Sequence, residues 1–427
     1  MKTQELYEKY LITSMVAGFE PVEVAEASKC TLVGADGRSY LDCFSGIAVT
    51  NAGHGHPKVL AAARAQLEKL VHCGTYLYYN PRAGELARLL AGITPGSLQK
   101  SFLGSSGAEA IEGALRLAKQ FTKRREVVCL TAGFHGRSVA TLSISGNRER
   151  KRNSGPYLSG VAFAPAPYCY RCPFQQTYPG CGLACAEYMD HVLRCQTAGD
   201  VAAFVAEPVL GEGGILVPPD GYFAVAVRHI RKDGALFIAD EVQSGFGRTG
   251  KMFAIEHYGV EPDLMAMAKG IADGFPLSAF IARADIAAAF TPGDHLSTFG
   301  GNPVCCAAAL ANIEAMLEED MPGNATRRGE QIRKRLGAFQ ERCGRIGDVR
   351  GRGLMIGVEL VTDLQQKTPA TNEARQVRAF CREQGLLIGI GGLYGNVLRV
   401  QPPLVLTEAE ADRACDILEK AIAQARG

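Results

Sequence analysis

Two groups that can support covalent chemistry follow two short apolar segments of the chain. Asp240 follows the segment 236–239, and Lys269 follows the segment 264–268. Apolar runs of this length are typical of buried strands, so we expect both groups at the carboxyl ends of strands, where open α/β sheets bind ligands. Burying an ammonium group is costly unless it is neutral, paired or covalently engaged, and an imine with a carbonyl compound removes that cost.

An aspartate and a lysine at neighbouring strand ends are the two groups that pyridoxal phosphate requires from a protein. The lysine holds the aldehyde of the cofactor, and the aspartate keeps the pyridine nitrogen protonated, so that the ring accepts electrons from a substrate carbanion. Taken singly, Asp240 is also explained as a turn cap and Lys269 as a surface lysine. The pair in its context favours the cofactor, with Lys269 as acid and base and Asp240 as its partner on the ring.

A turn that contains glycine, 104–107, leads into a segment with Ile111, Ala114, Leu115 and Ala118 on one helical face. The free backbone N–H groups and the dipole of a helix N-terminus favour an anion such as phosphate. Small polar turns begin many helices, so this signal is weak by itself.

Several further motifs occur in series with these. In this combination the sequence resembles the class III (subgroup II) pyridoxal-phosphate-dependent aminotransferases, which include 4-aminobutyrate, ornithine and acetylornithine aminotransferases. The motifs keep the order of that family over nearly the whole chain: Gly104-Ser-Ser-Gly-Ala-Glu-Ala110, Gly133-Phe-His-Gly-Arg137, Glu207-Pro-Val-Leu-Gly-Glu-Gly-Gly214, Ala239-Asp-Glu-Val-Gln-Ser-Gly-Phe-Gly-Arg-Thr-Gly250, Lys269, Thr298-Phe-Gly-Gly-Asn-Pro303, Gly347-Asp-Val-Arg-Gly-Arg-Gly353 and Arg399.

The resemblance implies an α/β protein with the fold-type I architecture of pyridoxal phosphate transferases. We expect a large domain with a mostly parallel seven-stranded sheet flanked by helices, and a small α+β domain built from both termini. Residues 1–57 would form the N-terminal segment of the small domain, 58–320 the large cofactor-binding domain, and 321–427 the C-terminal part of the small domain. A chain of 427 residues is long enough for this division.

The resemblance also assigns cofactor contacts residue by residue. Lys269 and Asp240 keep the roles given above, Phe134 stacks on the pyridine ring, and Gln243 binds its 3′-oxygen. Thr298 binds the phosphate of the neighbouring subunit's cofactor, which requires a homodimer or a dimer of dimers. The phosphate is cradled by Ser106, Gly107 and Ala108, where alanine replaces the serine of many relatives and leaves only a backbone N–H.

Four further residues match substrate contacts of the family. Ile47 touches the substrate chain, and Arg137 binds the distal carboxylate of 4-aminobutyrate. Glu212 pairs with Arg399 while an ω-amine is bound, and it moves away when a 2-oxo acid requires that arginine for its α-carboxylate. The presence of Glu212 therefore favours an enzyme that accepts both ω-amines and α-amino acids.

The resulting hypothesis is a pyridoxal 5′-phosphate-dependent aminotransferase that moves an amino group from an ω-amino acid, or from an α-amino acid, to a 2-oxo acid. An alanine:glyoxylate-type aminotransferase, an amino-acid racemase and a decarboxylase on the same fold stay open as alternatives. A nicotinamide oxidoreductase would need Gly-x-Gly-x-x-Gly after a strand, and the turn 104–107 does not supply it.

Charge and hydropathy exclude several other classes. Lys and Arg number 46 against 44 Asp and Glu, so no global field favours nucleic acid or an anionic membrane. No stretch has the length and apolarity of a signal peptide or a membrane span, and we expect a cytoplasmic enzyme.

Most of the 14 cysteines lie in apolar contexts that are typical of buried thiols in a reducing compartment. Cys169, Cys172, Cys181 and Cys185 form a Cys-x2-Cys-x8-Cys-x3-Cys pattern that could bind a metal, form disulfides or stay as thiols, and we take ordinary thiols as the default. The histidines of the segment 53–57 are expected in a turn rather than at a metal. No metal is therefore assigned to the site.

Overall fold

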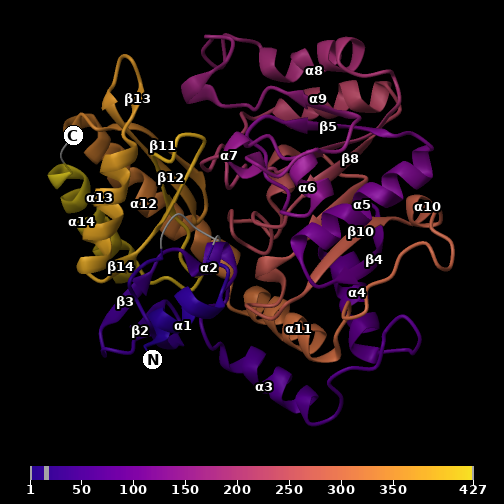
Figure 1. The fold of residues 1–427 in the computed structure, drawn as a ribbon, viewed down its shortest axis with the longest axis horizontal. Helices are drawn as coiled ribbons and strands as arrows, with labels where there is room; N and C mark the ends of the chain where they lie inside the picture. The colour runs from indigo at the N-terminus through magenta and orange to yellow at the C-terminus, as the bar shows by residue number, and fades with distance from the viewer. Residues whose placement is uncertain (1, 14–18, 426–427) are drawn as a thin grey trace.

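The structure is a computed structural model that describes residues 2–13 and 19–425. Figure 1 shows two lobes side by side, one containing a large sheet and the other containing both ends of the chain. The strands of the large sheet lie between residues 98 and 283, whereas the strands of the other lobe lie at 24–42 and 346–400. The division at residues 57 and 320 stays a prediction.

The large sheet has seven strands in the order β4-β10-β9-β8-β7-β5-β6. β5 to β9 pair in parallel, and β10 runs antiparallel to both of its neighbours. The mostly parallel sheet that we expected is confirmed. Its strands are β4 (Leu98–Gly104), β5 (Glu126–Leu130), β6 (Val161–Ala164), β7 (Val201–Ala206), β8 (Leu236–Asp240), β9 (Leu264–Met267) and β10 (Ser278–Arg283).

The central strands of this sheet are buried on both faces, which explains their continuous apolar sequences. Helix α5 (Gly107–Thr122) packs on β9 and β10 through its buried face, as its periodicity predicted. Helices α8 (Ala184–Cys195) and α9 (Tyr222–Lys232) pack together and against β6 and β8 respectively. The shorter elements of this lobe are α6 (Val139–Ser143), α7 (Arg148–Lys151), α10 (Ala284–Ala287), η1 (Cys169–Arg171), η2 (Ala254–Tyr258) and η3 (Lys269–Ile271).

Helix α3 (Pro57–Leu67) packs against α11 (Pro303–Glu318) at the lower edge of Figure 1, and α4 (Pro81–Ile93) packs on the other side of α11. Leu60, Ala63, Leu67 and Val71 recur at helical spacing, which predicts a helix from Val59 to Val71, but the helix ends at Leu67. Leu70 and Val71 are exposed, so their apolar side chains do not belong to a face packed on this chain.

The second lobe contains two sheets. In the first, β2 (Thr31–Gly34) and β3 (Ser39–Asp42) form the hairpin that the Asp-Gly turn at 36–37 between alternating apolar positions predicts, with β1 (Val24–Ser28) beside β2 and β14 (Leu386–Leu387) beside β3. The second has the order β11-β12-β16-β15, with β13 beside β12. The remaining elements are β11 (Ile346–Arg352), β12 (Met355–Asp363), β13 (Thr368–Pro369), β15 (Gly389–Gly391), β16 (Val397–Val400), α1 (Thr3–Tyr10), α2 (Ser45–Ala48), α12 (Met321–Cys343), α13 (Thr371–Glu383) and α14 (Glu408–Gln424).

Within residues 2–13 and 19–425, the helices are all too short or too polar to cross a membrane.

Candidate active site

Lys269 and Asp240 lie at the same edge of the large sheet. β8 and β9 are parallel neighbours, and Asp240 pairs in register with Ala266, three residues before Lys269. Burial lowers the pKa of Lys269, although the negative charges of Asp240 and Glu207 oppose this effect. In the described part of the chain, the Lys269 amine makes no hydrogen bond or ion pair, so it is available to a ligand carbonyl.

Asp240 is held by two hydrogen bonds. Its Oδ2 lies 2.7 Å from His135 Nδ1, and its Oδ1 accepts a bond of 3.0 Å from the backbone N–H of Val242. Burial works to lower the pKa of His135, but the hydrogen bond to Asp240 and the charges of Asp240 and Glu207 outweigh it and raise that pKa. The hydrogen bond from His135 thus holds the Asp240 carboxyl group at the end of β8, where it can face a pyridine nitrogen. We did not assign His135 from the sequence, although it belongs to the motif at 133–137.

Glu207 follows β7 and ties together two loops of the site. Its carboxylate accepts hydrogen bonds from the backbone N–H of Phe134 at 2.9 Å and of Gly211 at 2.8 Å. Burial, together with the charge of Asp240, raises the pKa of Glu207 to about 7. Glu207 thereby fixes the loop that carries Phe134 and the loop that carries Glu212.

The start of α5 lies against these loops. Ser106 caps the helix, with its Oγ accepting a hydrogen bond of 3.2 Å from the N–H of Glu109. A Cβ at Gly107 would lie 2.8 Å from Val242 Cγ1, and one at Gly136 would lie 2.9 Å from Ala108 Cβ. The first turn of α5 is therefore packed closely against both the strand end at Asp240 and the loop of Phe134, and its backbone N–H groups are suited to a phosphate.

Gln243 connects the large sheet to the second lobe. Gln401, which follows β16, donates a hydrogen bond of 3.1 Å from its Nε2 to Gln243 Oε1. Both side chains are buried. Gln401 was not predicted, because only the packing of the two lobes brings it to Gln243.

Glu212 and Arg399 form the ion pair that we expected. Arg399 Nη1 lies 2.9 Å from Glu212 Oε2, and the guanidinium lies 5.2 Å from the centroid of the Phe44 ring. The other carboxylate oxygen, Oε1, accepts a hydrogen bond from Arg150 of α7, which we did not predict. Burial works to raise the pKa of Glu212, but Arg399 and Arg150 outweigh it and lower that pKa.

The three other predicted contacts lie nearer the surface. Arg137 is exposed, with its guanidinium 5.6 Å from the centroid of the Phe134 ring. Ile47 is 39% exposed and has φ of 72°, and Thr298 is exposed in the loop before α11. Their roles toward a ligand stay predictions.

The four clustered cysteines line one small cavity of about 20 Å³ beside α8. All four are free thiols. In the residues that the structure describes, no group of three or more His, Cys, Asp or Glu side chains is arranged to hold a metal ion. The two histidines of segment 53–57 contact carboxylates instead, His54 with Asp42 at 2.8 Å and His56 with Glu319 at 3.0 Å.

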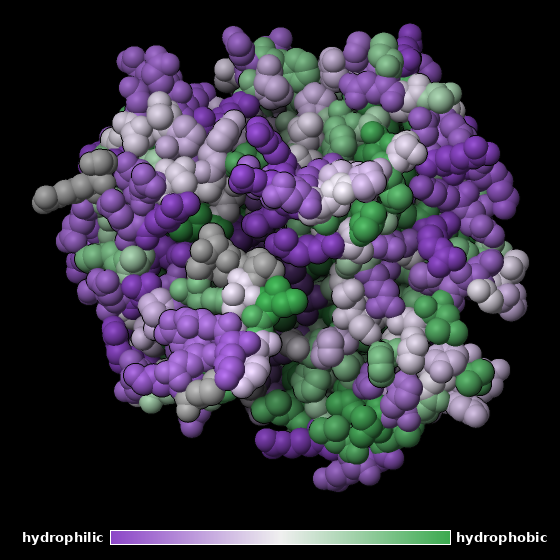
Figure 2. Space-filling view, viewed as in Figure 1, coloured by the Kyte–Doolittle hydropathy of each residue, from purple (hydrophilic) through white to green (hydrophobic). Residues whose placement is uncertain are grey.

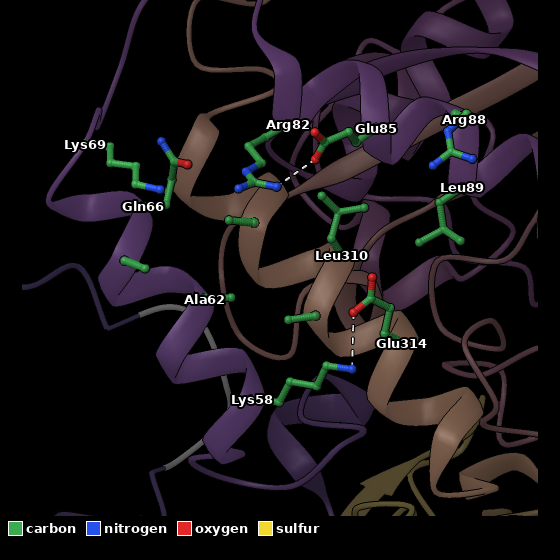
Figure 3. Close-up of a pocket in the computed structure, with 13 residues that line it drawn as sticks. Lys58, Ala62, Gln66, Lys69, Arg82, Glu85, Arg88, Leu89, Leu310 and Glu314 are labelled. Carbon is green, nitrogen blue, oxygen red and sulfur yellow. Dashed lines mark hydrogen bonds and ion pairs between the residues drawn. The ribbon is translucent and has the colours of Figure 1, made fainter.

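A separate hollow of about 360 Å³ lies between α3, α4 and α11 (Figure 3). Two of its cations are paired, Lys58 with Glu314 at 3.2 Å and Arg82 with Glu85 at 2.7 Å. The residues that line it include none of the predicted site residues. The chemistry therefore belongs to the sheet edge and not to this hollow.

The residues at the sheet edge fit pyridoxal phosphate. The aldehyde is matched by an unpartnered lysine of lowered pKa, and the ring nitrogen by a buried aspartate held by a histidine. The phosphate is matched by the start of α5, where neither Gly107 nor Gly136 of the adjacent loop leaves room for a Cβ.

Comparison with known proteins agrees with this assignment. The profile of the family described as Aminotransferase class-III matches residues 15–422. A leucine/methionine racemase of Thermococcus litoralis is 40% identical, over 99% of this chain and 96% of that protein. An acetylornithine aminotransferase of Methanothermobacter thermautotrophicus is 39% identical, over 97% of this chain and 96% of that protein.

The fold also matches solved structures. An amine transaminase from an uncultivated Pseudomonas species, solved in its PLP-bound form, superposes with a TM-score of 0.91 at 33% identity, over 97% of this chain and 98% of that chain. The sheet order and the second lobe from both termini therefore belong to the fold-type I architecture.

Proposed function

This chain belongs to the class III aminotransferases and is a pyridoxal-phosphate-dependent transaminase, and we propose that it moves the amino group of an ω-amino acid such as 4-aminobutyrate to a 2-oxo acid. The observation that carries the donor class is the ion pair of Glu212 and Arg399 at 2.9 Å. While this pair is closed, the arginine is unavailable to an α-carboxylate, which favours a donor whose amine-bearing carbon carries none. When it opens, Arg399 can bind the α-carboxylate of a 2-oxo acid.

When bound, pyridoxal phosphate supplies a carbonyl for the substrate amine and a ring that accepts electrons from the substrate carbon. Lys269 Nζ would move the proton of that carbon, first as base and then as acid. Its lowered pKa favours the neutral amine that the first of these steps requires. Asp240, held by His135, keeps the charge on the ring nitrogen.

Other side chains hold and orient the ligand in this proposal. Ser106, Gly107 and Ala108 bind the phosphate at the start of α5, Phe134 stacks on the ring, and Gln243 binds its 3′-oxygen. Arg137 binds the distal carboxylate of the donor, and Ile47 contacts its aliphatic chain. The close packing at Gly107 and Gly136 supports the phosphate assignment.

We also propose that the enzyme acts in the cytoplasm as a homodimer or a dimer of dimers, with Thr298 completing the phosphate site of the partner. The exposure of Thr298 and the 66% exposure of Phe299 beside it support an interface there. Apolar surface is also visible around α3 at the lower edge of the molecule (Figure 2), where Leu67, Leu70 and Val71 are exposed. Apolar patches of this kind are typical of subunit contacts.

A second candidate is an amino-acid racemase, because a leucine/methionine racemase is 40% identical over 99% of this chain. Racemisation uses the same cofactor site and returns the proton to the opposite face of the substrate carbon.

The absorption spectrum of the purified holoenzyme tests both candidates. We would add 4-aminobutyrate, ornithine, β-alanine and L-alanine separately, without an oxo acid. Conversion to the pyridoxamine spectrum by an ω-amine supports the proposal. An unchanged spectrum with every ω-amine, together with loss of the chirality of an α-amino acid, would favour the racemase.

A further inference from the structure

Glu212 lies between two arginines that come from different parts of the fold. Arg399 of β16 binds its Oε2, and Arg150 of the short helix α7 binds its Oε1. The Arg399 side chain is only 4% exposed and that of Glu212 12%, whereas that of Arg150 is 34% exposed. One carboxylate thus links a buried cation of the site to a cation nearer the solvent.

We propose that Arg150 is a specificity-determining residue, which retains Glu212 when Arg399 is released to the α-carboxylate of a substrate. This inference rests on the proposed function, in which Glu212 and Arg399 open and close. Arg150 acts through Glu212 and is therefore a positioning residue rather than a catalytic one.

The backbone around Glu212 is fixed, so opening of the pair is confined to the side chain. Arg350 donates hydrogen bonds to Gly214 O at 3.0 and 2.7 Å and to Ile215 O at 3.1 Å. Gly392 N–H donates to Glu212 O at 3.1 Å, and Glu207 holds the N–H of Gly211. A carboxylate that rotates on this anchored backbone leaves Arg399 but remains within reach of Arg150.

The energetic consequence differs between the two states. In the closed state Glu212 has two cationic partners, and in the open state it has Arg150 alone. A buried carboxylate without a partner is strongly unfavourable, so loss of Arg150 destabilises the open state more than the closed one. Arg150 thereby favours binding of α-carboxylates and has little effect on donors that bind to the closed pair.

The same helix offers matched controls. Arg148 lies in α7, and Arg152 is the residue directly after that helix. Both arginines are exposed and line an open surface hollow, whereas the ion pair to Glu212 is made by Arg150. Substituting Arg148 removes the same charge from the same segment and leaves the pair intact.

The experiment compares the wild type, Arg150→Met, Arg150→Lys and Arg148→Met as holoenzymes. Single-turnover absorption gives the apparent affinity of the ω-amine in one half-reaction and of the 2-oxo acid in the other. We expect Arg150→Met to weaken the apparent affinity for the oxo acid roughly tenfold and that for the ω-amine less than about twofold. Arg150→Lys should restore part of the affinity for the oxo acid, and Arg148→Met should leave both affinities unchanged. Glutarate has carboxylate groups but no reacting group. Its affinity, measured by calorimetry, should be weaker in Arg150→Met than in the wild type by a similar factor.

The inference would be overturned if Arg150→Met left both apparent affinities unchanged or weakened both by the same factor. Thermal unfolding checks that each variant is folded. Failure of the proposed function looks different, because the wild type itself would then give no spectral conversion with any ω-amine. A wild type that converts, beside an Arg150→Met variant that behaves like it, would refute only the role of Arg150.

Discussion

His135 Nδ1 lies 2.7 Å from Asp240 Oδ2, and both side chains are buried at the end of β8. The two residues are 105 positions apart in the sequence, so the contact depends on the alignment of β5 and β8 in the sheet. The histidine supplies a hydrogen bond to the aspartate where burial excludes water, and the same contact raises the pKa of the histidine.

Substituting His135 should therefore impair the ring-nitrogen contact. We expect His135→Ala to lower kcat roughly 10- to 100-fold, because Asp240 then loses the buried hydrogen bond that holds it in place beside the ring nitrogen. Steady-state kinetics over pH 6 to 9 would measure this. His229→Ala, which removes a partly buried histidine that is bound to Glu187 and lies outside the proposed site, is the control. Unchanged kinetics of the His135 variant would mean that the hydrogen bond from the N–H of Val242 is sufficient to hold Asp240 in place.

Lys269 should be the only lysine that the cofactor modifies. Borohydride reduction followed by peptide mass spectrometry should place the label on Lys269, and Lys269→Ala should lose the label together with at least about a 100-fold loss of turnover. Lys251→Ala, at an exposed lysine, should keep both properties. A label on another lysine of the wild type would contradict the assignment.

Gly136 should be required for cofactor retention. Its φ is +139°, and a Cβ there would lie 2.6 Å from Thr141 Oγ1 and 2.9 Å from Ala108 Cβ. We expect Gly136→Ala to displace the start of α5 and to weaken pyridoxal phosphate binding about tenfold or more, measured by dialysis and reconstitution. In Gly84→Ala a Cβ meets nothing within 4 Å inside α4, so this control should bind normally and gain up to about 1 kcal/mol in stability.

Glu241 should make stability depend on pH. Burial raises the pKa of Glu241 to about 7 in the folded protein, against about 4.5 for an ordinary glutamate. The folded state therefore holds a proton that the unfolded state has lost, and the resulting stability decreases as pH rises from about 4.5 to 7. Glu241→Gln removes this dependence. The difference in the free energy of unfolding between the variant and the wild type should therefore favour the variant by about 1–3 kcal/mol more at pH 8 than at pH 5.

Thermal unfolding of both proteins at these two pH values measures the difference. The amide that replaces the carboxyl group in this variant can still accept the N–H of Ile255 and donate to Ser244 Oγ, so the comparison isolates the charge. An equal difference between variant and wild type at pH 5 and pH 8 would exclude Glu241 as the titrating group.

Glu359 should stabilise the contact between the lobes. This buried carboxylate of β12 binds Arg171 Nε at 2.6 Å and Arg350 Nη1 at 2.8 Å, and Tyr168 also donates to it. Glu359→Gln leaves two largely buried arginines without their shared counter-charge and should cost about 3 kcal/mol of stability. Denaturant unfolding would show this, with exposed Glu383→Gln as the control expected to stay within about 0.5 kcal/mol.

The strands that carry the site could be predicted, because a strand buried on both faces has a continuous apolar sequence. β7 coincides with the apolar run 201–206, and β8 and β9 each differ by one residue from the apolar segments 236–239 and 264–268. The end of α3 could not be predicted in the same way. Leu70 and Val71 are as apolar as core residues, and the sequence pattern does not distinguish a side chain packed inside the subunit from an exposed one.

The polar contacts between distant segments were the other part that sequence could not supply. Arg150 reaches Glu212 across 62 positions, and Gln401 reaches Gln243 across 158. Nothing in their local sequence marks them, because both contacts depend on where α7 and the end of β16 lie after folding. The Glu212 and Arg399 pair could be anticipated only through the family motifs that contain it.

The pairing of β3 with β14 has a consequence for how the chain is made. Leu41 of β3 pairs in register with Leu386 of β14, so β3 is synthesised about 345 residues before the strand that pairs with it. At ordinary translation rates of about 5–20 residues per second, that interval lasts tens of seconds, during which the edge of β3 and its apolar side chains have no permanent cover. The last strand of the large sheet, β10, is complete at residue 283, whereas the N-terminal hairpin becomes part of its lobe only after β14 has been synthesised.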